Sequence, residues 1–104
     1  QFHKIMYGED KMLDKWISQA AGDAAKVDKR FLIIFKITSK RSAFVCLDID
    51  AFDLFIKPRN NVYPNNYIIY KNRYIIMEKV VFLNDYFKLY KSAEDWFYKK
   101  PQTI

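Results

Sequence analysis

The clearest pattern in the chain is a run of apolar residues that reads almost the same in both directions about Asn72. Residues 67–70 and 74–76 are aromatic or β-branched, and the polar residues 71–73 separate them. Two such runs joined by a short polar loop are typical of a β-hairpin. Three pairs of residues would then face each other across the strands: Tyr70 and Tyr74, Ile69 and Ile75, and Ile68 and Ile76.

Both faces of this hairpin are apolar, so we expect all four of its isoleucines to be mostly buried. One face should lie under an N-terminal helix. The other face should be covered by the C-terminal segment or by a second copy of the chain. We expect the second arm of the hairpin to continue to residue 83.

An amphipathic helix is predicted over residues 9–27. Its apolar residues recur at intervals of three and four, as they do on one face of a helix: Leu13, Trp16, Ile17, Ala20, Ala21 and Ala24. Glu9 and Asp10 suit the first turn, where the helix dipole favours negative charge. The small residues in its second half predict that the helix approaches the sheet closely.

Two strands are predicted after this helix. Residues 31–38 are apolar on both faces, which predicts a central strand. Residues 39–42 form a polar turn, and residues 43–49 return antiparallel to the first strand. Residues 53–56 fit either one helical turn or a short strand, and a loop rich in Asn and Pro follows over residues 58–66.

The C-terminal part of the chain fits two structures. In the preferred one, a turn at residues 84–85 leads to a fifth strand over residues 86–90. A short helix then begins at Ser92 and ends before Pro101. In the other, a single helix covers residues 85–98. The predicted fold class is α+β, with an N-terminal helix packed on an antiparallel sheet of four or five strands and a short C-terminal helix.

The length of 104 residues predicts one domain over residues 1–104, with frayed ends at residues 1–8 and 101–104. No apolar run approaches the roughly 20 residues that a membrane-spanning helix needs. The chain begins with Gln1 and not with Met, so we expect a fragment of a longer precursor. Our first explanation is an exported or membrane-tethered protein whose N-terminal segment has been removed, and the alternative is a chain that was shortened artificially from a longer one.

The residues of common catalytic sites are scarce. Cys46 is the only cysteine and lies in an apolar run, so we expect it to be buried and unreactive. The only histidine is His3, and there is no P-loop, dinucleotide fingerprint or metal-ligand spacing. We therefore expect no enzyme, no cofactor and no metal. Carboxylates that come together only in the folded protein are the alternative left open.

One short stretch, Leu-Asp-Ile-Asp-Ala-Phe at residues 47–52, resembles the metal-binding strand of nucleotidyl-transfer palm domains, such as those of diguanylate cyclases and lesion-bypass polymerases. The resemblance implies that Asp48 and Asp50 lie on one side of a strand and hold Mg²⁺ beside a triphosphate. The Gly-Gly-acid turn of the cyclases and the second acidic motif of the polymerases are absent. We therefore predict that neither aspartate binds a metal, and metal-dependent nucleotidyl chemistry at Asp48 and Asp50 is the third hypothesis.

The formal net charge of +6 is unevenly distributed. Residues 1–56 hold nine Lys/Arg against eight Asp/Glu, whereas residues 57–104 hold nine against four. This asymmetry, together with the long loop and the hairpin tip, predicts a basic binding face. It comprises Lys57, Arg59, Tyr63, Tyr67, Lys71 and Arg73.

The partner that we expect at this face is a protein with an acidic surface. Nucleic acid is the alternative, because tyrosines can stack on bases while lysines and arginines follow the phosphates. A homodimer formed through the sheet would also fit. The predicted function is thus a non-enzymatic protein-protein interaction or accessory module, with a nucleic-acid-binding accessory protein as the second hypothesis.

Overall fold

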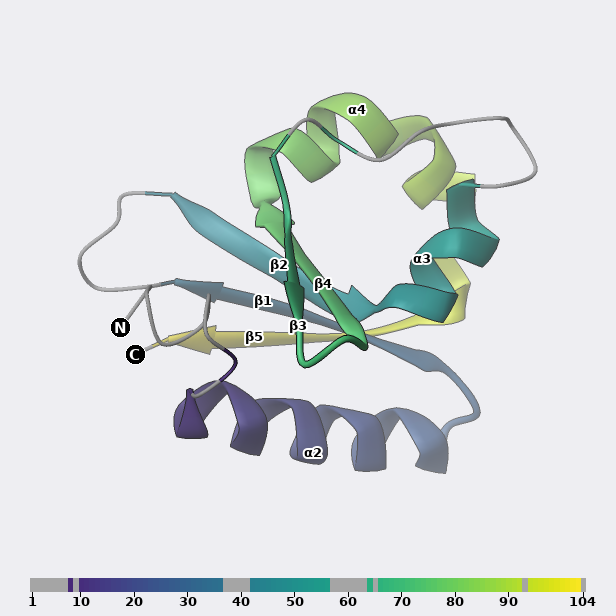
Figure 1. The fold of residues 1–104 in the computed structure, drawn as a ribbon. Helices are drawn as coiled ribbons and strands as arrows, with labels where there is room; N and C mark the ends of the chain where they lie inside the picture. Colours follow the sequence, from purple (N-terminus) through teal and green to yellow (C-terminus); the bar gives the residue numbers. More distant parts are fainter. Residues whose placement is uncertain are drawn as a thin grey trace.

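The computed structural model describes residues 8, 10–36, 42–56, 64, 66–92 and 94–103. Its elements are α2 (Lys11–Lys26), β1 (Arg30–Lys36), β2 (Ala43–Asp48), α3 (Ile49–Ile56), β3 (Ile68–Tyr70), β4 (Tyr74–Glu78), α4 (Lys79–Ser92), a short 3-10 helix (Glu94–Trp96) and β5 (Phe97–Thr103). The strands form one sheet in the order β3-β4-β2-β1-β5. Figure 1 shows α2 on one face of this sheet and α3 and α4 on the other, which confirms the α+β fold class.

Helix α2 covers one face of the sheet with the residues that its periodicity predicts. It begins one residue after Asp10, whose carboxylate accepts a hydrogen bond from the backbone N–H of Leu13 at 2.8 Å. Of the predicted apolar face, Ala21 is exposed and the other five residues are buried: Leu13, Trp16, Ile17, Ala20 and Ala24. The rings of Trp16 and Phe35 lie 5.9 Å apart, which joins this face to the middle of the sheet.

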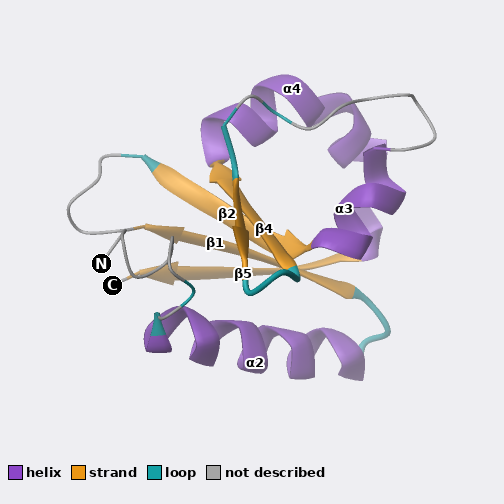
Figure 2. Ribbon diagram, viewed as in Figure 1, coloured by secondary structure: helices purple, strands orange, loops and turns teal. Residues whose placement is uncertain are grey.

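A second apolar core lies on the other face of the sheet, under α3 and α4. Its buried members are Leu32, Val45, Leu47, Phe52, Ile75, Met77, Phe82, Tyr86 and Phe97. The rings of Phe52 in α3 and Tyr86 in α4 meet edge to face at 5.3 Å. Figure 2 shows the strands, in orange, between the helices of the two faces. The sheet is therefore buried on both sides, and Cys46 is confirmed as a buried residue within it.

The predicted hairpin pairing is confirmed. Tyr70 pairs with Tyr74, and the two isoleucine pairs follow in the expected register. Lys71 and Asn72 have φ values of 52° and 56°, and the Arg73 N–H donates to the Tyr70 carbonyl at 3.1 Å. Positive φ at both central residues is the property of a type I′ turn.

The burial of the hairpin is only partly as predicted. Ile75 and Ile76 in β4 are buried, but Ile68 is half-buried and Ile69 is 36 % exposed. The reason is that β3 is an edge strand of three residues, so its side chains have neighbours on one side only. The second arm ends at Glu78 and not at residue 83.

The C-terminal part differs from both predicted structures. Residues 79–92 form α4, and the predicted C-terminal helix is replaced by β5, which pairs parallel to β1. The sheet is consequently mixed and not antiparallel. Parallel strands cannot be joined by a tight turn, and α4 supplies the crossover connection from β4 to β5. Residues 101–103, predicted to be frayed, belong to β5, and its Pro101 is tolerated because the strand lies at the sheet edge.

Tyr70 joins β3 to the start of α2. Its side chain is fully buried, and its hydroxyl accepts a hydrogen bond from the Asp10 N–H at 3.1 Å. The hydroxyl proton can be donated to Asp14 Oδ1 at 2.6 Å or to the Asp10 carbonyl at 2.9 Å. Lys71 Nζ donates to the other oxygen of Asp14 at 2.9 Å. One tyrosine thus fixes the helix against the hairpin, across 60 residues of chain.

We predict that Tyr70→Phe lowers the free energy of unfolding by roughly 1–3 kcal/mol, because it leaves a buried backbone N–H without its partner. Chemical denaturation measures this change. The matched control is Tyr74→Phe, since Tyr74 is the cross-strand neighbour and its hydroxyl forms no hydrogen bond within the described residues. Equal stabilities of the two variants would contradict the structural role of the Tyr70 hydroxyl.

We also predict a pH dependence from Asp14. Burial by itself raises the pKa of Asp14, but hydrogen bonds from Tyr70 and Lys71 and the Lys71 charge together outweigh it and lower the pKa below its ordinary value of 3.8. The ionised carboxylate therefore stabilises the fold above pH 3.8, and this contribution is lost as the pH falls through the lower folded-state pKa. Asp14→Asn should be less stable than the parent at neutral pH, and the difference should shrink in acid. Denaturation curves at neutral and at acidic pH measure this difference. If the parent and Asp14→Asn differed equally in their free energy of unfolding at both pH values, the prediction would be contradicted.

Candidate functional site

A charged cavity of about 260 Å³ opens at the end of the sheet where β2 passes into α3. Its apolar lining comes from Ala21, Ala24 and Ala25 of α2, Phe31 of β1 and Ala51 of α3. Its charged lining comes from three separate segments of the chain: Lys29 and Arg30, Asp48 and Asp50, and Arg73. Since small side chains on α2 leave this space open, the sequence feature that predicted close helix–sheet approach also creates the cavity.

Lys29 and Arg30 are positioned by the way α2 ends. Asp28 has a φ of 56°, and its N–H donates to the carbonyl of Ala25 at 3.2 Å. The Lys29 N–H donates to the carbonyl of Ala24 at 2.9 Å. This pair of hydrogen bonds with a left-handed residue between helix and strand is a Schellman motif. The chain therefore turns sharply and begins β1 at Arg30, beside the end of the helix.

Asp48 is the last residue of β2, and its side chain caps the helix that follows. Its Oδ1 accepts a hydrogen bond from the backbone N–H of Asp50 at 2.9 Å, which satisfies one of the free donors at the start of α3. Asp50 lies exposed in the first turn of that helix. The expectation that the two aspartates lie on one side of a strand is therefore wrong, because the strand ends between them. Of the two structures considered for residues 53–56, the helical one is confirmed.

Arg73 reaches the cavity from the start of β4. Its Nε donates to Asp48 Oδ2 at 3.3 Å, and its guanidinium lies 5.6 Å from the centre of the Tyr74 ring. The Ile49 N–H donates to the Arg73 carbonyl at 2.8 Å, so the hairpin turn is also tied by its backbone to the start of α3. The hydrogen bond to Asp48 raises the pKa of Arg73. The Arg73 side chain remains 69 % exposed despite these contacts.

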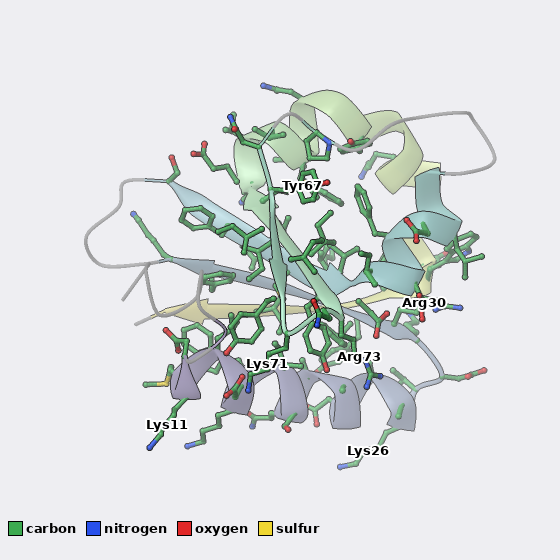
Figure 3. All side chains as sticks on the ribbon, viewed as in Figure 1. Lys11, Lys26, Arg30, Tyr67, Lys71 and Arg73 are labelled. Atoms are coloured by element: carbon green, nitrogen blue, oxygen red, sulfur yellow. The ribbon has the colours of Figure 1, made fainter. Side chains whose placement is uncertain are left out.

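The cavity thus places three cationic side chains beside two carboxylates. Lys29 and Arg30 make no ion pair within the described ranges, whereas Arg73 is paired with Asp48. Figure 3 shows Arg30 and Arg73 towards one end of the molecule and Lys11 at the opposite end of α2. Such a concave, positively charged site suits an anion that can accept several hydrogen bonds.

Three residues of the predicted binding face lie within the described structure: Tyr67, Lys71 and Arg73. Lys57, Arg59 and Tyr63 lie outside the described residues. Tyr67 is exposed and comes just before β3, whereas Lys71 and Arg73 come after this strand. About 13 Å of extended chain therefore separates Tyr67 from Lys71. Figure 3 shows Tyr67 far from both cations. Lys71 is bound to Asp14, which leaves Arg73 as the described member of the predicted set that lines the cavity.

Sequence reasoning missed Lys29 and Arg30. They lie in the half of the chain whose charges nearly balance, so a count by halves directs attention away from them. The available indication was local, namely two adjacent cations between the end of a predicted helix and the start of a central strand.

The described residues do not fit a metal centre. No group of three or more His, Cys, Asp or Glu side chains within them could hold a metal ion. Asp48 accepts a hydrogen bond from the Asp50 N–H on one oxygen and from Arg73 on the other, so both of its oxygens already have partners within the protein. The prediction that Asp48 and Asp50 bind no metal still awaits a binding measurement.

A protein-family model described as "Phage putative PDDEXK endonuclease" matches residues 1–96. No curated protein and no solved structure shows significant similarity to the chain. The family match corrects two predictions. The non-enzymatic interaction module is wrong as the main function, and so is the expectation that the chain is not an enzyme, because the matched family is described as one of putative endonucleases.

The letters in that description can be compared with the chain as residue types. They contain a proline followed by an acidic residue, and an acidic residue two positions before a lysine. The chain has no proline followed by Asp or Glu, and an acidic residue stands two positions before a lysine only at Glu9 and Lys11. Glu9 lies outside the described residues.

Other expectations stay predictions. No helix in the described part of the chain is long and apolar enough to span a membrane. The expected partner, the homodimer through the sheet and the exported or membrane-tethered location likewise stay predictions.

Proposed function

The chain belongs to the phage putative PDDEXK endonuclease family, and we propose on this premise that it cleaves phosphodiester bonds within a nucleic acid strand. The observation that carries the proposal is the family match, which covers residues 1–96 of the 104-residue chain. Nucleases often use bound metal ions to stabilise the attacking and leaving oxygens.

The charge of the molecule supports a nucleic acid as the partner. The chain carries a formal net charge of +6, and Lys29, Arg30 and Arg73 gather at one cavity. Cations that contact backbone phosphates release condensed counterions, and this release supplies much of the affinity for nucleic acid. The nucleic-acid partner, which was the second hypothesis from sequence, is therefore favoured over an acidic protein.

Cleavage of covalently closed circular DNA tests the main proposal, because a circle has no ends and can be cut only internally. We predict that the protein converts supercoiled plasmid or single-stranded circles to nicked or linear forms with Mg²⁺ or Mn²⁺, and that EDTA abolishes the conversion. The activity should fall in Lys29→Glu/Arg30→Glu. It should persist in the matched control Lys11→Glu/Lys15→Glu, which reverses two exposed charges near the other end of α2.

Three other outcomes are informative. Salt-sensitive binding without cleavage, with either metal and on both DNA and RNA circles, would contradict the endonuclease. The absence of both binding and cleavage would contradict the nucleic-acid partner as well. Cleavage that is equal in the two double variants would show a nuclease whose substrate does not pass over the cavity.

A further inference from the structure

We propose that the cavity is a subsite for one backbone phosphate of the nucleic acid, and that Arg73 exchanges Asp48 for this phosphate when the strand binds. The chemical identity of the ligand rests on the proposed function. The position of the subsite and the exchange rest on the contacts of Arg73, Asp48, Lys29 and Arg30.

Little free energy is needed to break the ion pair between Asp48 and Arg73. Only Nε of the guanidinium contacts the carboxylate, at 3.3 Å, whereas charge-assisted N–H···O bonds usually measure about 2.7–2.9 Å. The Arg73 side chain is largely exposed, and exposed ion pairs typically contribute about 0–1 kcal/mol. A phosphate that replaces Asp48 therefore competes with a weak interaction.

A phosphodiester offers Arg73 more than Asp48 does. It carries the same single charge, and its two free oxygens match the fork of a guanidinium, which can bind them through two parallel hydrogen bonds. Asp48 cannot rotate freely to do the same, because its other oxygen caps α3 through the Asp50 N–H. Asp48 thus holds Arg73 at the cavity through one N–H group and leaves the other N–H groups of the guanidinium without a contact to this carboxylate.

The remaining lining of the cavity also suits a phosphate. Lys29 and Arg30 are free of ion pairs within the described residues, so their charges are available to the same ligand. The start of α3 adds the positive end of a helix. The end of α2 has the opposite polarity, but the carbonyls of Ala24 and Ala25 already accept the hydrogen bonds of the Schellman motif. The alanines of α2 leave an apolar surface where a sugar can pack.

Asp50 provides a matched control for Asp48. Both are carboxylates that line the cavity, but Asp50 makes no side-chain hydrogen bond to Arg73 in the described structure. Asn at either position removes one negative charge with almost no change of shape. Asn at position 48 can also still cap α3, because an amide oxygen accepts the same hydrogen bond. A difference between the two variants therefore reports the Arg73 contact and not the charge.

The test is fluorescence anisotropy of a labelled single-stranded oligonucleotide in EDTA, so that binding is measured without cleavage. Asp48→Asn should bind several-fold more tightly than the parent, whereas Asp50→Asn should change affinity clearly less. Arg73→Gln should bind more weakly, and its plot of log affinity against log salt should be shallower by about 0.7, the value for one phosphate contact on a single strand. Arg73→Lys should show an intermediate affinity, because it keeps the charge and loses the fork.

Specific outcomes would overturn the subsite. Equal tightening by Asp48→Asn and Asp50→Asn would show a general charge effect without exchange. An unchanged affinity and salt slope in a folded Arg73→Lys and Arg73→Gln pair would remove Arg73 from the interface. Displacement of the oligonucleotide by thymidine 5′-monophosphate near the oligonucleotide's own Kd would assign the cavity to small phosphate ligands.

The results also separate this inference from the proposed function. Cleavage of circles without the difference between Asp48→Asn and Asp50→Asn would overturn the subsite and leave the endonuclease standing. The difference in affinity without any cleavage would overturn the endonuclease and leave the subsite standing.

Discussion

Burial of the sheet on both faces is the constraint on which the rest of the structure depends. With α2 on one side and α3 and α4 on the other, the middle of β1 and β2 admits only apolar side chains. Charged residues are therefore confined to the ends of these strands. Because β1 and β2 are antiparallel, the start of β1 at Arg30 and the end of β2 at Asp48 meet at the same end of the sheet. The charged cavity lies there as a direct consequence.

Local pattern predicted the parts of the fold that local interactions determine. The hairpin about residues 71–73, helix α2 and the antiparallel pair β1 and β2 all follow from periodicity and short connections. The parallel pairing of β5 with β1 does not, because it depends on a crossover past two other strands. The start of α4 was not predicted either. Val80, Val81 and Phe82 continue the apolar pattern of β4, and no residue typical of a turn separates the strand from the helix.

The site was less predictable than the fold because its residues meet only in three dimensions. Arg73 was among the predicted binding residues, but its described neighbours in the cavity come from α2 and the turn after it, from β1, and from the junction of β2 and α3. The resemblance implied that Asp48 and Asp50 lie on one strand, and this is wrong because β2 ends between them. The residue patterns did not predict an enzyme, because the sequence shows none of the spacings typical of a catalytic site. The indication of a nuclease comes from the family match.

The exchange of Arg73 from carboxylate to phosphate can be observed directly through its Nε–H resonance in ¹H–¹⁵N NMR spectra, assigned by comparison with Arg73→Lys. Titration with a single-stranded oligonucleotide in EDTA should shift this resonance saturably, with the same Kd that anisotropy gives. In Asp48→Asn, the resonance of the free protein should differ from that of the parent, and the bound positions should converge. An Arg73 resonance that stays unchanged while the oligonucleotide saturates the protein would show that the Asp48–Arg73 pair remains intact and that the phosphate binds elsewhere.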